Sequence, residues 1–301
     1  MLRRYFFWYL LLFVASCTAT TNNERSNNNS LLKEKDKLLF AVSDVPGLEE
    51  LQRDYEPFRS ALEDVLETKI EFFPVDNIVE ATTALQLGLV DLVHVGPSEY
   101  AIVRARTNAI PIVALTRPNY LSIIAVRRDS GIESLADLKG KIIELGEVGM
   151  TANYIGPIKM VIDAGLNPQS DIKIVYSKDY QLKALKNGDL DAWGRGLHRY
   201  EVALQQEGVS ESDYLILAKG PQLPHDVFIA SSKLEPILVD EIRQRMLKNQ
   251  DRLLQAILSV PMSASLLNSK FKGATLAPAN DSDYDMIREV YKAMGEENFI
   301  K

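Results

Sequence analysis

Apolar residues follow two alternating periods along most of this chain. Residues 37–43 (KLLFAVS) form a short apolar run that predicts a strand. The segment after it spaces Leu51, Tyr55 and Phe58 as one face of a helix would. This alternation predicts an α/β protein in which helices cover both faces of a parallel sheet. Further strands are predicted at residues 70–75, 91–96, 110–117, 120–128, 141–146, 171–177, 189–194 and 213–220.

One stretch of the sequence occurs twice, about one hundred residues apart. Residues 84–92 and 184–192 share the pattern A-L-x-x-G-x-x-D. Each copy reads as the end of a helix, a glycine cap, and a strand that is entered through Asp91 or Asp191. The repeat indicates two similar α/β lobes, with chance as the alternative, since helix-glycine-strand units are common in proteins of this class.

Four turns that follow predicted strands are candidates for a ligand site. They are Ser43–Asp44, Gly96–Tyr100, Gly149–Tyr154 and Gly194–Tyr200. Open α/β sheets bind ligands beyond the carboxyl ends of their strands, where helix N-termini present free N–H groups. If two lobes face each other, these turns line the cleft between them. Their N–H groups and their Ser and Thr hydroxyls would suit a small anion.

The first 17 residues (MLRRYFFWYLLLFVASC) predict an export signal. Arg3 and Arg4 precede the apolar run 5–15, which is shorter than the stretch of about 20 residues that spans a membrane. Small residues stand directly before Cys17, and this arrangement resembles the bacterial lipobox, in which the cysteine thiol is lipidated. An incidental cysteine behind an ordinary signal peptide is the alternative. We expect residues 1–16 to be removed and Cys17 to carry lipid.

The segment after Cys17 is expected to be a tether. Residues 18–35 are polar and rich in asparagine, so they bury too little apolar surface to offset the entropy of ordering. A leash of this kind, together with the lipid, would hold a folded domain near a membrane and leave it free to rotate.

Charge and composition exclude several classes of function. The chain has 34 Lys and Arg against 41 Asp and Glu, a net charge of −7, which argues against binding nucleic acid. Cys17 is the only cysteine, so an internal disulfide is excluded. The three histidines, His94, His198 and His225, are too far apart in sequence for a local zinc motif. We expect neither a metal nor a cofactor.

Six stretches, spread over nearly all of residues 36–260, form a set of motifs in a specific order and spacing. They are YEPFRSALED, the G-x-V-D-L-x-x-x-G-P-S-x-Y of Gly88–Tyr100, YLSIIAVRRDSGIESLADLKGK, the G-x-T-x-x-Y-x-x-P of Gly149–Pro157, ALKNGDLDA and PQLPHDVFIASSKL. Together they resemble the phosphonate, phosphite and phosphate substrate-binding proteins of ABC transporters.

The resemblance implies a two-lobed type II periplasmic-binding-protein fold with the ligand cleft between the lobes. Lobe one would contain residues 36–118 and 222–301, lobe two would contain residues 119–221, and the two crossovers would serve as the hinge. Ligand binding would close the lobes and present the cargo to a membrane permease. The location implied is extracytoplasmic, and a monomer is expected.

The resemblance carries over only part of the family's ligand site. Tyr100 ends the G-P-S-x-Y motif, and Thr151 stands where the family has the threonine of an anion-binding Ser-Thr-Ser loop. The serine neighbours are replaced by Met150 and Ala152, which removes two hydroxyl donors. Tyr120 matches a family position near the ligand, with packing in its strand as the alternative.

Two cations stand where the family has other groups. Lys178 aligns with a family histidine, and Arg195 lies beside Gly196, near the position of the carboxylate that accepts a ligand proton in the family. This exchange would favour a fully charged anion, although either cation could instead be solvated. The candidate ligand-binding residues are Ser43, Ser98, Tyr100, Tyr120, Met150, Thr151, Ala152, Lys178, Arg195 and His198.

Three classes of function were compared on these grounds. The leading hypothesis is a lipid-anchored binding protein that captures a small oxyanion, such as a phosphonate, phosphite or phosphate-like compound, for an ABC importer. A sensory module of the same fold with a different anionic or polar ligand is the alternative. An enzyme is not expected, because the sequence offers no nucleophile-base pair, carboxylate dyad or metal set.

Overall fold

The computed structural model describes residues 32, 35–177, 182–259, 271 and 273–301. Cys17, nearly all of the expected tether and Lys178 lie outside these residues. The strands are β1 (Lys37–Val42), β2 (Lys69–Phe72), β3 (Leu92–Val95), β4 (Ile110–Leu115), β5 (Ser122–Arg127), β6 (Ile142–Leu145), β7 (Lys173–Tyr176), β8 (Ala192–Gly196), β9 (Tyr214–Lys219), β10 (Asp226–Ala230) and β11 (Leu276–Pro278). The α-helices are α1 (Leu48–Leu66), α2 (Ile78–Leu87), α3 (Pro97–Thr107), α4 (Gly156–Asp163), α5 (Leu182–Asn187), α6 (Leu197–Glu207), α7 (Pro236–Lys248), α8 (Gln250–Leu258) and α10 (Asp285–Ala293).

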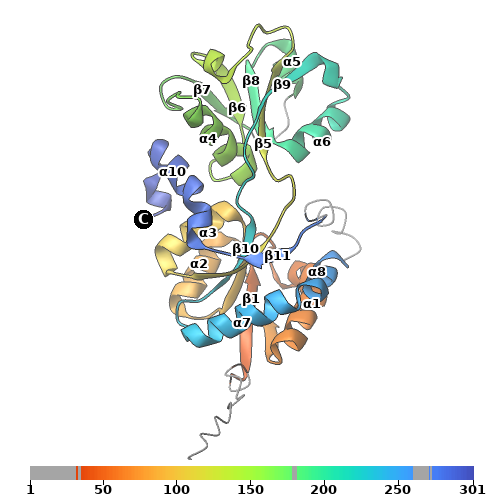
Figure 1. The fold of residues 1–301 in the computed structure, drawn as a ribbon, viewed down its shortest axis with the longest axis vertical. Coiled ribbons are helices and arrows are strands. Elements are labelled where there is room, and N and C mark those ends of the chain that lie inside the picture. Colours follow the sequence, from red (N-terminus) through yellow and green to blue (C-terminus); the bar gives the residue numbers. More distant parts are fainter. Residues whose placement is uncertain (1–31, 33–34, 178–181, 260–270, 272) are drawn as a thin grey trace, which may run out of the picture. The chain divides into compact units, whose positions relative to one another are not determined.

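The strands form two sheets. The first has the order β11-β4-β10-β3-β1-β2 and therefore combines strands from both ends of the chain (Figure 1). The second has the order β7-β6-β8-β5-β9 and uses only the middle of the chain. The chain thus passes from the first sheet to the second between β4 and β5, and it returns between β9 and β10.

The expected parallel arrangement is wrong for part of each sheet. Strands β2, β1 and β3 are parallel, as are β7, β6 and β8, but β10 runs antiparallel to β3 and β5 runs antiparallel to β8. The reason is the crossover. Each crossing chain enters its new sheet beside the carboxyl ends of the parallel strands, so that β5 and β10 must run away from that edge.

Helices cover both faces of each sheet, as the sequence predicts. In β1, Leu38, Phe40 and Val42 pack in one core with residues of α1, α7 and α8, while Ala41 faces the core shared with α2 and α3. The second sheet packs α4 on one face and α5 with α6 on the other. The period of two along β1 therefore separates two cores.

The hundred-residue repeat corresponds to a repeated structure. Asp91 precedes β3 and accepts a hydrogen bond from the Leu39 N–H of β1 at 2.8 Å; Asp191 precedes β8 and accepts one from the Ile142 N–H of β6, also at 2.8 Å. The preceding Gly88 and the matching Gly188 both have positive φ. Each copy thus ends a helix and fixes a parallel neighbour strand by the same carboxylate contact.

The folded part begins earlier than the sequence indicates. Leu32 falls in the expected tether, yet its side chain is fully buried in the core with α1. Its carbonyl accepts a hydrogen bond from the Thr68 hydroxyl at 2.8 Å, and Lys35 forms an ion pair with Asp91 at 2.6 Å. A single apolar residue within a polar segment gives no periodic signal, so its docking could not be foreseen.

Candidate functional site

The four candidate turns come together, as the sequence predicts for strand ends. Ser98, in the first turn of α3, donates its N–H to the Thr151 Oγ1 at 3.2 Å, and the two hydroxyls are 3.1 Å apart. Gly196, at the end of β8, donates its N–H to the Asn153 Oδ1 at 3.0 Å. The first of these contacts joins turns that belong to different sheets, and the second joins two turns of the second sheet.

A cavity of about 670 Å³ opens where these turns meet. Cavities of about 300–1,000 Å³ commonly hold small ligands. Its wall includes parts of the first crossover, of the turn before α4 and of the first turns of α6. The lining residues are Asp44, Arg117, Pro118, Asn119, Tyr120, Met150, Thr151, Ala152, Asn153, His198, Arg199, Glu201 and Val202.

Arg117 supplies a buried positive charge to this cavity. Its residue is only 8% exposed, and the guanidinium carbon lies 3.5 Å from the centroid of the Tyr120 ring. The Nη1 is 3.6 Å from the carboxylate of Asp226, so one side of the guanidinium is paired. Its Nε is buried and forms no hydrogen bond within the described part of the chain. A guanidinium on a cavity wall is suited to an anion, because its N–H groups form charge-assisted hydrogen bonds with oxyanions.

The crossover holds Arg117 and Tyr120 in place through backbone contacts. Gln222, in the returning crossover, donates through its Nε2 to the carbonyls of Arg117 and Tyr120 at 3.0 and 3.1 Å. The Arg117 N–H donates to the Nδ1 of His225 at 3.2 Å. The two crossovers are therefore bonded to each other directly beside the cavity.

Tyr120 presents a hydroxyl to the same wall. Burial raises the pKa of this phenol, while the nearby Arg117 and Thr151 pull the pKa down in part. Its hydroxyl remains protonated at neutral pH and can donate a hydrogen bond. With Arg117 it provides two donor groups of the kind that bind oxyanions, and the Thr151 hydroxyl, which donates to the Ser98 Oγ at 3.1 Å, lies on the same wall.

The turn before α4 is a single π-helical turn, η3 (Thr151–Ile155). Its Ala152 carbonyl accepts a hydrogen bond from the Ser122 hydroxyl at 2.7 Å, and the Asn153 carbonyl accepts one from the Gly146 N–H at 2.8 Å. Turns of the π type occur often at functional sites. Here the turn brings Met150, Thr151, Ala152 and Asn153 to the cavity wall.

Acidic groups lie on and near the cavity wall: Asp44 and Glu201 line it, and Glu99 is in the first turn of α3. Glu99 accepts hydrogen bonds from the Ser43 hydroxyl at 2.5 Å and from the Gly96 N–H at 2.9 Å. Burial raises the pKa of Glu99, and the negative charges of Asp44 and Asp226 add to the increase. The N-terminus of α3 is thus capped from within the chain, and Arg117 balances a locally negative surface.

Comparison with known proteins identifies the family. Residues 45–284 match the family model described as the periplasmic substrate-binding protein of the phosphonate ABC transporter. The chain belongs to this family. Its members are transport substrate-binding proteins and not enzymes, as the sequence predicts, and the location of the family is extracytoplasmic.

Several solved structures share the fold of this phosphonate-binding family chain. PhnD1 from Prochlorococcus marinus in complex with methylphosphonate is 18% identical, with a TM-score of 0.56 over 87% of this chain and 99% of that one. The aliphatic sulphonate binding protein SsuA from Escherichia coli is 18% identical, with a TM-score of 0.56 over 88% and 89%. XAC2383 from Xanthomonas citri, bound to ATP, is 15% identical, with a TM-score of 0.61 over 89% and 100%. At such identities the likeness shows the two-lobed fold.

Five of the predicted ligand-binding residues of this phosphonate-family chain lie on the cavity wall. They are Tyr120, Met150, Thr151, Ala152 and His198. Ser98 is one hydrogen bond away, through Thr151. Lys178 is outside the described residues.

Three other predicted residues, Ser43, Tyr100 and Arg195, form contacts away from the cavity. The Ser43 hydroxyl donates a hydrogen bond to Glu99. Tyr100 is fully buried and donates its hydroxyl to Asp281 at 2.7 Å. None of these side chains is part of the cavity wall.

Arg195 is the clearest departure from a ligand role. It is 2% exposed and forms an ion pair of 2.5 Å with Glu144, whose side chain is fully buried. It also donates to the Ser177 carbonyl at 3.1 Å. The charge of Glu144 is thus met by Arg195 inside the second sheet.

Sequence reasoning did not select Arg117, Asn119 or Asn153. Arg117 follows the strand β4, so the strand-end rule that selected four other turns applied to it as well. The four selected turns each lead from a strand into a helix, whereas the chain after β4 crosses to the other sheet. Arg117 was therefore not recognised as a residue at a strand end.

The described residues contain neither a membrane-spanning helix nor a cluster of metal ligands. No helix among them is both long and apolar enough to cross a bilayer. In the same residues, no three His, Cys, Asp or Glu side chains are grouped as metal ligands would be.

Proposed function

We propose that this protein captures a small oxyanion of the phosphonate, phosphite or phosphate class and delivers it to an ABC permease. The proposal includes attachment to a membrane through lipid on Cys17. It also includes two lobes that close on the ligand: lobe one is residues 36–118 with 222–301, and lobe two is residues 119–221. The protein would act as a monomer. The distribution of strands between the two sheets supports these boundaries.

The group formed by Arg117, Tyr120 and Thr151 is the observation that carries the proposal. A guanidinium and two hydroxyls line one cavity, and the positive charge of Arg117 offsets part of the rise that burial causes in the pKa of Tyr120. A tetrahedral oxyanion offers several acceptor oxygens, which can take hydrogen bonds from the guanidinium and from the Tyr120 hydroxyl. Bonds between a guanidinium and a phosphorus oxyanion are charge-assisted and about twice as strong as neutral ones.

The acidic groups at the cavity restrict the orientation of a bound anion. Asp44 and the capped Glu99 would repel an anion that approached them, so the charged end of the ligand should face Arg117. The serine hydroxyls that the family places beside Thr151 are replaced by Met150 and Ala152. We therefore assign the anion to the side of the cavity formed by the first crossover.

Calorimetric titration of the full protein in detergent tests the proposal. Methylphosphonate, phosphite, phosphate, sulfate and ethanesulfonate would each be titrated into wild type, into Arg117→Gln and into Arg106→Gln. Arg106 is an exposed arginine on α3 and provides the matched control. Binding of a phosphorus oxyanion that Arg117→Gln weakens and Arg106→Gln preserves supports the proposal.

Other outcomes of this titration would overturn the proposal. Binding of ethanesulfonate or sulfate alone would mean that the fold serves a different cargo. A lack of binding by all five anions would favour the sensory module. Equal binding by wild type and Arg117→Gln would remove Arg117 from the site.

A further inference from the structure

The last segment of the chain connects two regions that the sheet topology separates. It leaves the first sheet at the end of β11 and continues through the short 3-10 turn η5 (Asp281–Tyr284) into α10. Side chains of α10 then pack in one core with residues of α3 and of α4. Residues 280–300 are called the C-terminal strap below.

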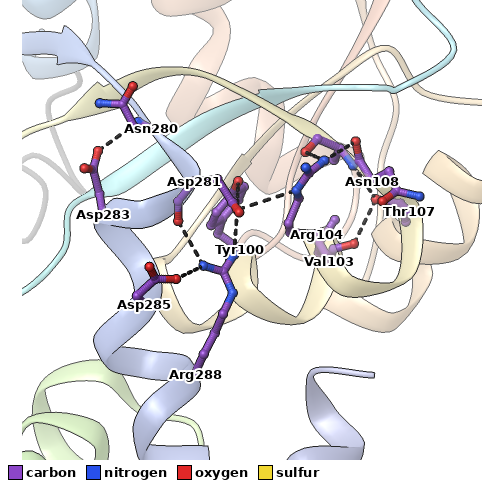
Figure 2. Close-up of polar contacts among 11 residues, drawn as sticks. Tyr100, Val103, Arg104, Thr107, Asn108, Asn280, Asp281, Asp283, Asp285 and Arg288 are labelled. Atoms are coloured by element: carbon purple, nitrogen blue, oxygen red, sulfur yellow. Dashed lines mark hydrogen bonds and ion pairs between the residues drawn. The ribbon is translucent and has the colours of Figure 1, made fainter.

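The near end of the strap is fixed to α3 by a polar network (Figure 2). The Tyr100 hydroxyl donates to the Asp281 carboxylate at 2.7 Å, and Arg288 donates to the same carboxylate oxygen at 2.5 Å. Arg104 approaches that oxygen to 3.5 Å. Burial alone would raise the pKa of Asp281, but the hydrogen bonds from Tyr100 and Arg288 outweigh it and hold this pKa below its usual value. The carboxylate therefore stays charged and anchors the strap.

The far end of the strap contacts the turn that supplies Thr151 to the cavity. The Tyr154 hydroxyl, at the end of the turn η3, lies 2.9 Å from each carboxylate oxygen of Glu296. Beside this contact, the Gln169 Nε2 donates to the Met294 carbonyl at 2.7 Å. Tyr154 is fully buried, so this hydrogen bond fixes a side chain that cannot turn toward solvent.

A third contact involves Tyr291, in the middle of the strap. Its ring is 1% exposed, and its hydroxyl lies 3.3 Å from the position that a Cβ on Gly149 would occupy. Within the described residues this hydroxyl has no hydrogen-bond partner. Burying an unpaired hydroxyl is costly. The middle of the strap therefore lies against the backbone of Gly149, at the start of the same loop.

We propose that the C-terminal strap positions the loop Gly149–Tyr154 for ligand binding. In this role Tyr154 and Glu296 are positioning residues, and Tyr100 is an anchor of the strap and not a ligand contact. The inference rests on the proposed function only in assigning the loop to a ligand. The contacts themselves link the loop to the first sheet through Asp281 and α3, so that movement of one end is transmitted to the other.

Hydrogen exchange in the ligand-free protein tests the mechanical part without any ligand. Tyr154→Phe and Glu296→Gln each should speed exchange of peptides covering residues 146–156 by about threefold to tenfold, and the double variant should add little, since contacting residues act as one unit. Glu297→Gln, which alters only the exposed pair with Lys301, is the matched control. Unchanged exchange in both single variants would overturn the proposal.

Titration with methylphosphonate tests the functional part. The variants that speed exchange should weaken binding by a similar factor, while Glu297→Gln should not. Faster exchange with undiminished affinity would overturn the role of the strap in binding. If wild type binds none of the tested oxyanions, the proposed function fails, and the exchange result still decides whether the strap holds the loop.

A double-mutant cycle between Tyr100→Phe and Asp281→Asn identifies the role of Tyr100. As an anchor, Tyr100 should couple to Asp281 in both exchange and affinity, so that either single variant has nearly the effect of the pair. A loss of affinity in Tyr100→Phe alone, with wild-type behaviour in Asp281→Asn, would show that Tyr100 contacts the ligand directly. That result would overturn its assignment as an anchor.

Discussion

The guanidinium of Arg117 stacks on the ring of Tyr120, with its central carbon 3.5 Å from the ring centroid. This contact orients the planar fork of the arginine, and Asp226 holds one side of it. An oriented fork loses less entropy when it binds an anion than a mobile lysine does. The pair therefore gives the cavity an arginine whose orientation is fixed before an anion binds.

Replacing Arg117 should weaken ligand binding strongly. A hydrogen bond to a charged group contributes about 1.5–3 kcal/mol, so Arg117→Gln should lower oxyanion affinity by roughly tenfold to a hundredfold. Arg117→Lys should recover only part of the loss because its ammonium lacks the planar fork. Isothermal titration checks both values, and full rescue by lysine would contradict the importance of the stacked geometry.

Thr151 should matter through its hydroxyl. Thr151→Val keeps the shape and removes the acceptor for the Ser98 N–H, so we expect unfolding stability to fall by about 1–2 kcal/mol and affinity to fall about tenfold. Thr151→Ser keeps the hydroxyl and should behave nearly as wild type. Urea unfolding and titration measure the two effects. A loss in Thr151→Ser together with wild-type behaviour in Thr151→Val would mean that the methyl group, and not the hydroxyl, is what counts.

Glu99 should make the stability depend on pH. Its pKa is raised in the folded state by burial, so its contribution is most favourable below the ordinary carboxyl pKa and is lost as pH rises through the raised value. Glu99→Gln keeps an oxygen acceptor for Ser43 and Gly96 and removes this titration. The variant should therefore gain stability relative to wild type between pH 5 and pH 8. Urea unfolding at both values provides the comparison, and a constant difference would speak against a raised pKa.

The ion pair between Arg195 and Glu144 should be a stability element. Arg195→Met leaves the Glu144 carboxylate buried without its partner, which should cost about 3–5 kcal/mol. Adding Glu144→Gln should restore much of that loss, because the stranded charge is gone. Urea unfolding of the two singles and the double measures this. If the double is no more stable than Arg195→Met, the pairing is not the source of the cost.

The overall plan of the fold could be predicted because it depends on periodic patterns. The repeat that contains Asp91 and Asp191 indicated two similar units, and each aspartate performs the same contact in its sheet. The convergence of the turns at Ser98 and Thr151 followed from the rule for strand ends. These inferences required only local spacing and a general property of α/β sheets.

The roles of individual charges could not be predicted in the same way. Arg195 and Arg117 both lie at or just after the end of a strand. Arg195 pairs with Glu144, which is 51 residues away in sequence, whereas Arg117 lines the cavity. Spacing along the chain does not reveal which carboxylate a cation will meet. The same limit applies to Tyr100, whose partner Asp281 is 181 residues away.

The docking of Leu32 and Lys35 has a mechanical consequence. They place the start of β1 at Lys37, about 20 Å along the strand from Ser43 and the cavity edge. Strand β1 is hydrogen-bonded to parallel neighbours on both sides, β2 and β3. Tension applied through the N-terminal chain would load both ladders in shear, so that many hydrogen bonds resist together. A pull on that end would thus be borne by the sheet before it could distort the pocket.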